Sequence, residues 1–99
     1  MPSNYIKVIC FPTDGDPHEE AFPLEKFLDH CNEYLGGYVA NVQSTREPDK
    51  VLLVDEDAAF KSKARNTRAS LHYIHTSVYG PALLVDRDEW TRAMEYDHD

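Results

Sequence analysis

Positive charge, cysteine and long apolar runs are scarce in this sequence, and each shortage excludes a class of protein. Ten lysines and arginines stand against 18 aspartates and glutamates in 99 residues, so the formal net charge is −8. A surface of this sign repels nucleic acid and anionic membranes, and we expect no direct binding to either. No apolar run reaches the roughly 18 residues of a membrane-spanning helix, and the first residues lack the pattern of a signal peptide. We therefore expect a cytoplasmic protein.

Cysteine and histidine offer few metal ligands. Cys10 and Cys31 are the only cysteines, and their spacing matches no C-x-x-C motif. We expect two buried free thiols, as is usual in a reducing cytosol. His72 and His75, three residues apart, form the best ligand pair, and His30 and Cys31 are further candidates. Because no third ligand is evident, the sequence predicts no metal site.

Catalytic motifs are missing as well. The sequence contains no P-loop, no G-x-S-x-G elbow and no H-E-x-x-H pair. His30 and Cys31 are neighbours, so on a helix their side chains diverge by about 100° and cannot act together. We expect no catalytic residues, no cofactor and no enzyme activity.

What the chain does contain is a series of apolar segments separated by turn residues. Its 99 residues predict a single domain. The expected strands are residues 5–11, 38–42, 51–54 and 78–85, and the expected helices are 23–35, 67–75 and 87–96. Residues 12–20 are expected to be a loop, because proline, glycine and aspartate cluster there.

This β-α-β-β-α-β-α order matches the split β-α-β pattern of ferredoxin-like folds. We expect an α+β fold with a mainly antiparallel sheet, helices on one face and a helix at the C-terminal end. A more irregular sheet, with a second helix of only a turn or two, is the alternative. Four consecutive apolar residues, Val51–Val54, indicate a strand that is central or covered on both faces. Pro81 indicates an edge or a bulge near the start of the last strand.

Four short sequences occur in order along the chain. They are Gly36-Gly37-Tyr38 after the first helix, Val54-Asp55-Glu56 at a strand end, Asn66 with Ala69, and Gly80-Pro81-Ala82-Leu83-Leu84-Val85. In this pattern the chain resembles a family of small domains of unknown function that occurs in phages, large DNA viruses and bacteria. The resemblance covers roughly residues 24–86. It implies an accessory protein of a mobile element, and it implies no reaction and no catalytic residues.

Acidic side chains crowd the first third of the chain. They are Asp14, Asp16, Glu19, Glu20, Glu25, Asp29 and Glu33. The last three are four residues apart, so on a helix they would form a stripe with a spacing of about 6 Å. Such a row resembles the phosphates of a nucleic-acid strand and can occupy the basic groove of a nucleic-acid enzyme. The alternatives are a solvated helix face, or a cation at the Asp14-Gly15-Asp16 turn, which lacks the rest of a calcium loop.

Basic side chains cluster between positions 61 and 68. They are Lys61, Lys63, Arg65 and Arg68, and Asn66 is a candidate helix N-cap. Cationic side chains beside the free N–H groups of a helix start can hold a phosphate or a nucleotide. The alternative is a loop whose charges balance the preceding Asp55-Glu56-Asp57.

We therefore expect a small acidic, non-catalytic interaction protein of phage or viral type. It would inhibit a host nucleic-acid-handling or defence complex, in the host cytoplasm, by binding a host protein with a basic surface. The alternatives are a small anion- or nucleotide-binding module that uses residues 61–68, and a structural virion component. The protein would be a monomer or a homodimer joined at the sheet edge expected near Pro81.

Overall fold

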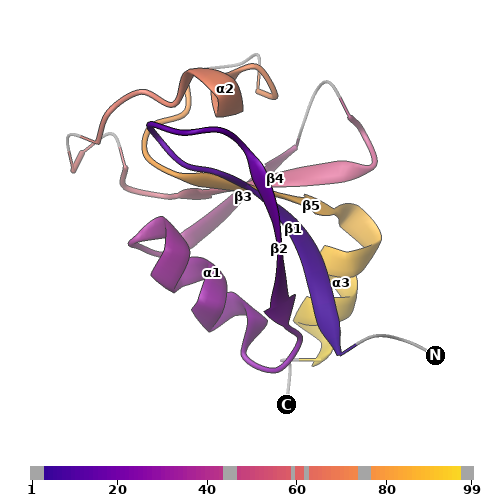
Figure 1. The fold of residues 1–99 in the computed structure, drawn as a ribbon. Coiled ribbons are helices and arrows are strands. Elements are labelled where there is room, and N and C mark those ends of the chain that lie inside the picture. Colours follow the sequence, from indigo (N-terminus) through magenta and orange to yellow (C-terminus); the bar gives the residue numbers. More distant parts are fainter. Residues whose placement is uncertain (1–3, 44–46, 59, 62, 74–76, 97–99) are drawn as a thin grey trace.

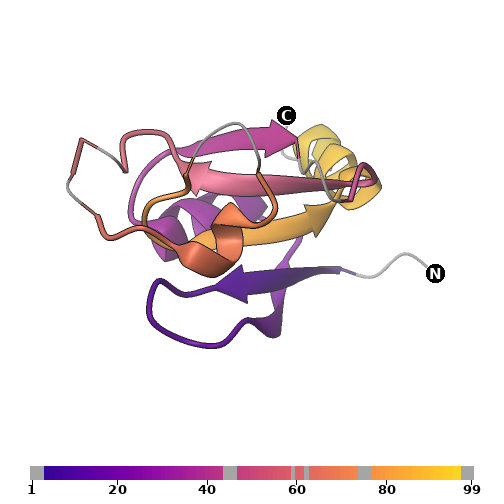
Figure 2. The ribbon, with the colours of Figure 1, turned by 90° about the horizontal axis from the view of Figure 1, so that it is seen from above.

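The chain folds as a five-stranded sheet with helices on both faces (Figures 1 and 2). The computed structural model describes residues 4–43, 47–58, 60–61, 63–73 and 77–96. The elements are β1 (Tyr5–Phe11), β2 (His18–Pro23), α1 (Phe27–Leu35), β3 (Val39–Gln43), β4 (Lys50–Asp55), α2 (Thr67–Ser70), β5 (Ala82–Asp86) and α3 (Arg87–Tyr96). The strand order is β2-β1-β5-β4-β3, and every neighbouring pair is antiparallel. No helix of the described part is long and apolar enough to cross a membrane.

The core lies in two layers, one on each face of the sheet. Figure 1 shows α1 and α3 below the sheet and α2 above it. Alternate residues of a strand face opposite ways. Accordingly, Leu53 and Leu83 pack towards α1 and α3, whereas Leu52 and Leu84 pack in the layer that contains Ala69 of α2. The unbroken apolar runs of β4 and β5 thus have a physical reason, because these strands lie inside the sheet and both of their faces are buried.

The coarse fold prediction is confirmed: the protein is α+β with an antiparallel sheet. The element order is wrong, because β2 (His18–Pro23) pairs with β1 where residues 18–20 are predicted to be a loop and Pro23 is predicted to begin a helix. A split β-α-β unit contains parallel strands, and the described sheet has none. The expectation of helices on one face fails for α2, which covers the second face of β4 and β5. Pro81 does not mark an edge: β5 begins one residue later and lies between β1 and β4.

Helix α1 is shorter than predicted at its start. Pro23 ends β2, opposite Tyr5, and Lys26 has a left-handed backbone (φ 59°), so the helix begins at Phe27. Its end is as predicted: Gly36 has a left-handed backbone (φ 76°) and donates its N–H to the Asn32 carbonyl over 2.9 Å. The range of α3 is confirmed. Both cysteines are buried free thiols, as predicted.

Helix α2 has only the single turn of the alternative prediction, and Asn66 holds it in place. The Asn66 side chain is buried at 1% exposure, and its Nδ2 donates to the carbonyls of Phe11 and Gly80, each over 2.9 Å. Its Oδ1 accepts the Ala69 N–H over 3.0 Å, which is the predicted N-cap. One side chain therefore connects β1, the residue before Pro81 and α2.

Replacing Asn66 with alanine should lower the free energy of unfolding by about 3 kcal/mol, since two buried carbonyls and one N–H lose their partner. Urea denaturation measures this loss. Thr67→Ala, an exposed neighbour, is the control and should change stability by no more than about 0.5 kcal/mol. A loss below about 1 kcal/mol for Asn66→Ala would show that these bonds do not hold the segment.

Candidate functional site

The β1–β2 hairpin gathers four of the predicted acidic residues at one edge of the sheet. We call residues 12–23 the acidic hairpin. Asp14 and Asp16 lie in its loop, Glu19 and Glu20 lie on β2, and all four are exposed. Figure 2 shows the hairpin along one side of the sheet. Within the described sheet, β2 is bonded to β1 alone. Its outer N–H and C=O groups are therefore open to a further strand.

The acidic side chains of the hairpin point in different directions. Glu19 stands opposite Ile9 and Glu20 opposite Val8, so the two carboxylates lie on opposite faces of the sheet. Lys7 Nζ lies 3.4 Å from Glu19, and Arg68 Nη2 lies 3.0 Å from Asp16. These ion pairs are exposed to water, and such pairs contribute only about 0–1 kcal/mol. Because these pairs are weak, a basic partner can replace Lys7 and Arg68 in them. The edge therefore keeps its negative electrostatic field.

The predicted stripe of Glu25, Asp29 and Glu33 does not form as expected. Glu25 precedes α1 and is separated from it by the left-handed Lys26, so it does not share the helical repeat. Asp29 and Glu33 lie one turn apart on α1 and are exposed. The seven predicted acidic residues therefore divide between the hairpin, the turn before α1 and the helix itself.

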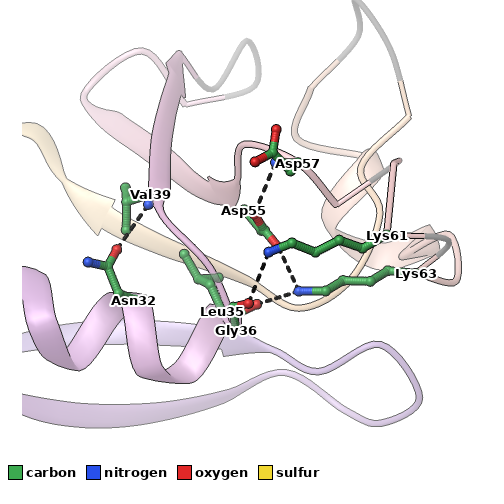
Figure 3. Close-up of polar contacts among 8 residues, drawn as sticks. All are labelled: Asn32, Leu35, Gly36, Val39, Asp55, Asp57, Lys61 and Lys63. Atoms are coloured by element: carbon green, nitrogen blue, oxygen red, sulfur yellow. Dashed lines mark hydrogen bonds and ion pairs between the residues drawn. The ribbon is translucent and has the colours of Figure 1, made fainter.

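Two of the predicted anion-binding lysines surround a buried carboxylate instead (Figure 3). The Asp55 side chain at the end of β4 is only 1% exposed. Lys61 Nζ lies 3.0 Å and Lys63 Nζ 2.7 Å from its Oδ2. The same ammonium groups donate to the last carbonyls of the α1 region, Lys63 to Leu35 over 2.7 Å and Lys61 to Gly36 over 3.2 Å. Cations suit this end of a helix, where the carbonyls lack partners.

The contacts with Lys61 and Lys63 favour the ionised form of the Asp55 carboxyl. Burial acts to raise the pKa of this carboxyl, but hydrogen bonds from Lys63, from the Asp57 N–H and from Lys61 outweigh it and lower the pKa to about 2. Gly37 packs directly against the carboxylate, and a Cβ at this position would overlap it. The second glycine of the Gly36-Gly37 pair is thus required by close approach, and the first by the helix cap.

The other predicted anion-binding residues are also engaged within the molecule. Arg65 Nε donates to Ser77 Oγ over 3.0 Å, and Arg68 pairs with Asp16. The Asn66 side chain accepts the Ala69 N–H, one of the free N–H groups at the start of α2, and this helix is only four residues long. The five side chains do not converge on a common open site, so the geometry gives the anion-binding interpretation no support.

Sequence reasoning missed a group of three side chains on the hairpin. Cys10 of β1 stands directly opposite His18 of β2, and Glu20 lies on the same face two residues on. The Cys10 thiol donates to Glu20 Oε2 over 3.2 Å, and His18 Nε2 lies 3.0 Å from the same oxygen. Hydrogen bonds from Cys10 and His18 lower the pKa of Glu20. Burial, together with the hydrogen bond and charge of Glu20, raises the pKa of Cys10 to about 12.

Tyr34 of α1 borders this group. Its hydroxyl is buried and lies beside the Cys10 sulfur. Burial and the neighbouring Cys10 and Glu20 raise its pKa to about 12. The strand register would have revealed the group. His18 and Glu20 are two residues apart, so their side chains lie on the same face of β2, and this face is the one that carries Cys10 on β1. The metal-ligand candidates named from the sequence lie elsewhere. Cys31 is buried in the core, and His30 packs near Phe22. His72 packs near Phe11, and His75 falls outside the described residues.

No protein-family model, no curated protein and no solved structure matches this chain. The resemblance to the phage and viral domain family therefore stays a prediction from the residues quoted for it.

Replacing Asp55 with asparagine should change the pH dependence of stability. The folded-state pKa of Asp55 lies at about 2, below its ordinary value of 3.8, so its contribution is complete above that value and is lost as pH falls through about 2. The variant should be about 2 kcal/mol less stable at neutral pH, and its stability should fall less between about pH 4 and pH 2. Urea denaturation across this range measures both effects.

The matched control for this variant is Asp29→Asn, which removes an exposed carboxylate of α1. It should keep the wild-type profile. If Asp55→Asn also kept the wild-type profile, the buried carboxylate would not be the group that responds to acid.

Proposed function

We propose that this protein is a non-catalytic interaction module that binds a protein partner with a basic surface through the acidic hairpin. The observation that carries the proposal is that exposed carboxylates and, within the described sheet, unpaired backbone N–H and C=O groups occur together on the edge strand β2. Asp14, Asp16, Glu19 and Glu20 are exposed along an edge strand whose outer hydrogen-bonding groups have no partner strand in the described sheet.

An edge strand binds an extended segment by adding it to the sheet. Main-chain hydrogen bonds then supply affinity, and alternate side chains supply specificity. Because Glu19 and Glu20 point to opposite faces, a strand laid along β2 meets negative charge on both of its sides. An extended basic segment satisfies both faces, whereas an acidic one is repelled. The net charge of −8 adds long-range attraction for the same class of partner.

The class of partner follows from this chemistry together with the sequence resemblance. Proteins that handle nucleic acid expose basic surfaces, and the resemblance to phage and viral domains implies a host protein of this kind. The module would inhibit a host nucleic-acid-handling or defence complex by occupying its basic surface in the host cytoplasm. The thiol of Cys10 is held in its protonated form, because burial and the neighbouring Glu20 raise its pKa to about 12.

Charge reversal of the hairpin tests the proposal. The double variant Asp14→Lys and Glu19→Lys leaves Asp16 with Arg68, and leaves Glu20 with its neighbours. An extended peptide of alternating lysine and valine serves as the basic probe. Its addition to the wild-type protein should shift the amide NMR signals of His18–Pro23 more than others, and the double variant should bind it at least about tenfold more weakly.

The double variant Asp29→Lys and Glu33→Lys on α1 is the matched control, since it changes the net charge by the same amount. It should keep most of the affinity, and binding to the wild-type protein should weaken as salt rises. Equal losses in the two variants would mean that the peptide senses only overall charge. Amide shifts centred on α1 would place the binding surface on the helix instead.

A further inference from the structure

Cys10, His18 and Glu20 offer three metal-ligand atoms that already lie together. One ligand atom from each residue lies within 4.8 Å of the other two, and Glu20 Oε2 lies 3.2 Å from Cys10 Sγ and 3.0 Å from His18 Nε2. In a tetrahedral zinc site with bonds of about 2.0–2.3 Å, ligand atoms stand about 3.3–3.6 Å apart. Only small side-chain movements separate the two arrangements. We propose that Cys10, His18 and Glu20 form a zinc site at the edge of the sheet.

The backbone holds the three ligands in register. Cys10 and His18 are direct cross-strand partners, and Glu20 follows two residues after His18, so all three side chains share one face of the β1–β2 pair. Cys10 is fully buried, whereas the side chains of His18 and Glu20 are 50% and 47% exposed. An ion can therefore reach the site from solvent past the half-exposed side chains of His18 and Glu20. The buried thiol of Cys10 forms the inner end of the site.

The donor set selects among metals. A thiolate, an imidazole and a carboxylate together suit Zn²⁺, which binds all three, better than Ca²⁺ or Mg²⁺, which prefer oxygen ligands alone. Three protein ligands leave the fourth tetrahedral position to water. In binding, the Cys10 S–H bond breaks, the proton passes to buffer and a sulfur–zinc bond forms, with no change of oxidation state.

Tyr34 of α1 borders the proposed site. Its buried hydroxyl interacts with the Cys10 sulfur. Once Cys10 has lost its proton, its thiolate is a stronger acceptor for the Tyr34 O–H than the neutral thiol is. A hydrogen bond of this kind is a common second layer of support around metal-bound sulfur.

Binding is tested with Zn²⁺ and with Co²⁺ as a spectroscopic probe, on the reduced full chain. One equivalent should bind, with proton release detected by calorimetry in buffers of different ionisation enthalpy, and Co²⁺ should give thiolate charge-transfer absorption. His18→Ala, Glu20→Gln and Cys10→Ser should each weaken binding at least about 100-fold, more than the loss of an outer-layer contact.

Each variant has a matched control on the same type of residue. His30→Ala changes a histidine of α1, Glu19→Gln changes the carboxylate on the opposite face of β2, and Cys31→Ser changes the second buried thiol. These controls should keep the affinity of the wild-type protein. His18 and Glu20 are half-exposed, so their variants test the site even where Cys10→Ser disturbs folding.

Two results would overturn the site: no binding of Zn²⁺ to the wild-type protein, or unchanged affinity in any one of the three ligand variants. Either result is separable from failure of the proposed partner binding, because the partner-binding variants alter Asp14 and Glu19 and leave these ligands in place.

Discussion

The buried carboxylate of Asp55 is the constraint on which the rest of the structure depends. A buried charge is tolerated only when it is paired and hydrogen-bonded. Here Lys61 and Lys63 come from the segment after β4, and both also bond the carbonyls that end α1. One cluster thus joins the end of β4, the end of α1 and the two lysines that follow β4 in the chain. Gly37 lacks a side chain because the carboxylate occupies that space.

The buried side chain of Asn66 is the second polar group that joins distant segments. Asn66 ties α2 to β1 and to Gly80, and Gly80 in turn leaves room for Lys63. The four short sequences of the family-like pattern therefore meet around two buried polar groups, although they are far apart in the chain. Their residues stabilise the fold, and their buried polar side chains, Asp55 and Asn66, are occupied by contacts within the protein. This explains why the basic residues, which look like an anion site in the sequence, serve as internal partners.

The groups that remain available lie at the other edge, on the β1–β2 hairpin. An exposed edge strand invites unwanted pairing, and charged side chains are a common protection against it. Glu19 and Glu20 on β2 repel a second copy of the same edge while they favour a basic strand. A zinc ion on Cys10, His18 and Glu20 would join β1 and β2 across the hairpin and reduce the local negative charge. The two proposals therefore concern one strand and share Glu20, whereas Asp14 and Glu19 belong to partner binding alone and Cys10 and His18 to the zinc site alone.

Features set by sequence neighbours were determined by the sequence alone: the end of α1 at Gly36, the range of α3, the Asn66 cap and the buried strand of Val51–Val54. Each depends on local periodicity or on backbone conformation. Tertiary structure alone decided the rest. His18–Pro23 is polar and mostly exposed, so only pairing with β1 makes it a strand, and the register of that pairing decides which side chains share a face. The pairing of Asp55 with Lys61 and Lys63, and the meeting of Cys10 with His18, likewise depend on distances between segments, which no local pattern encodes.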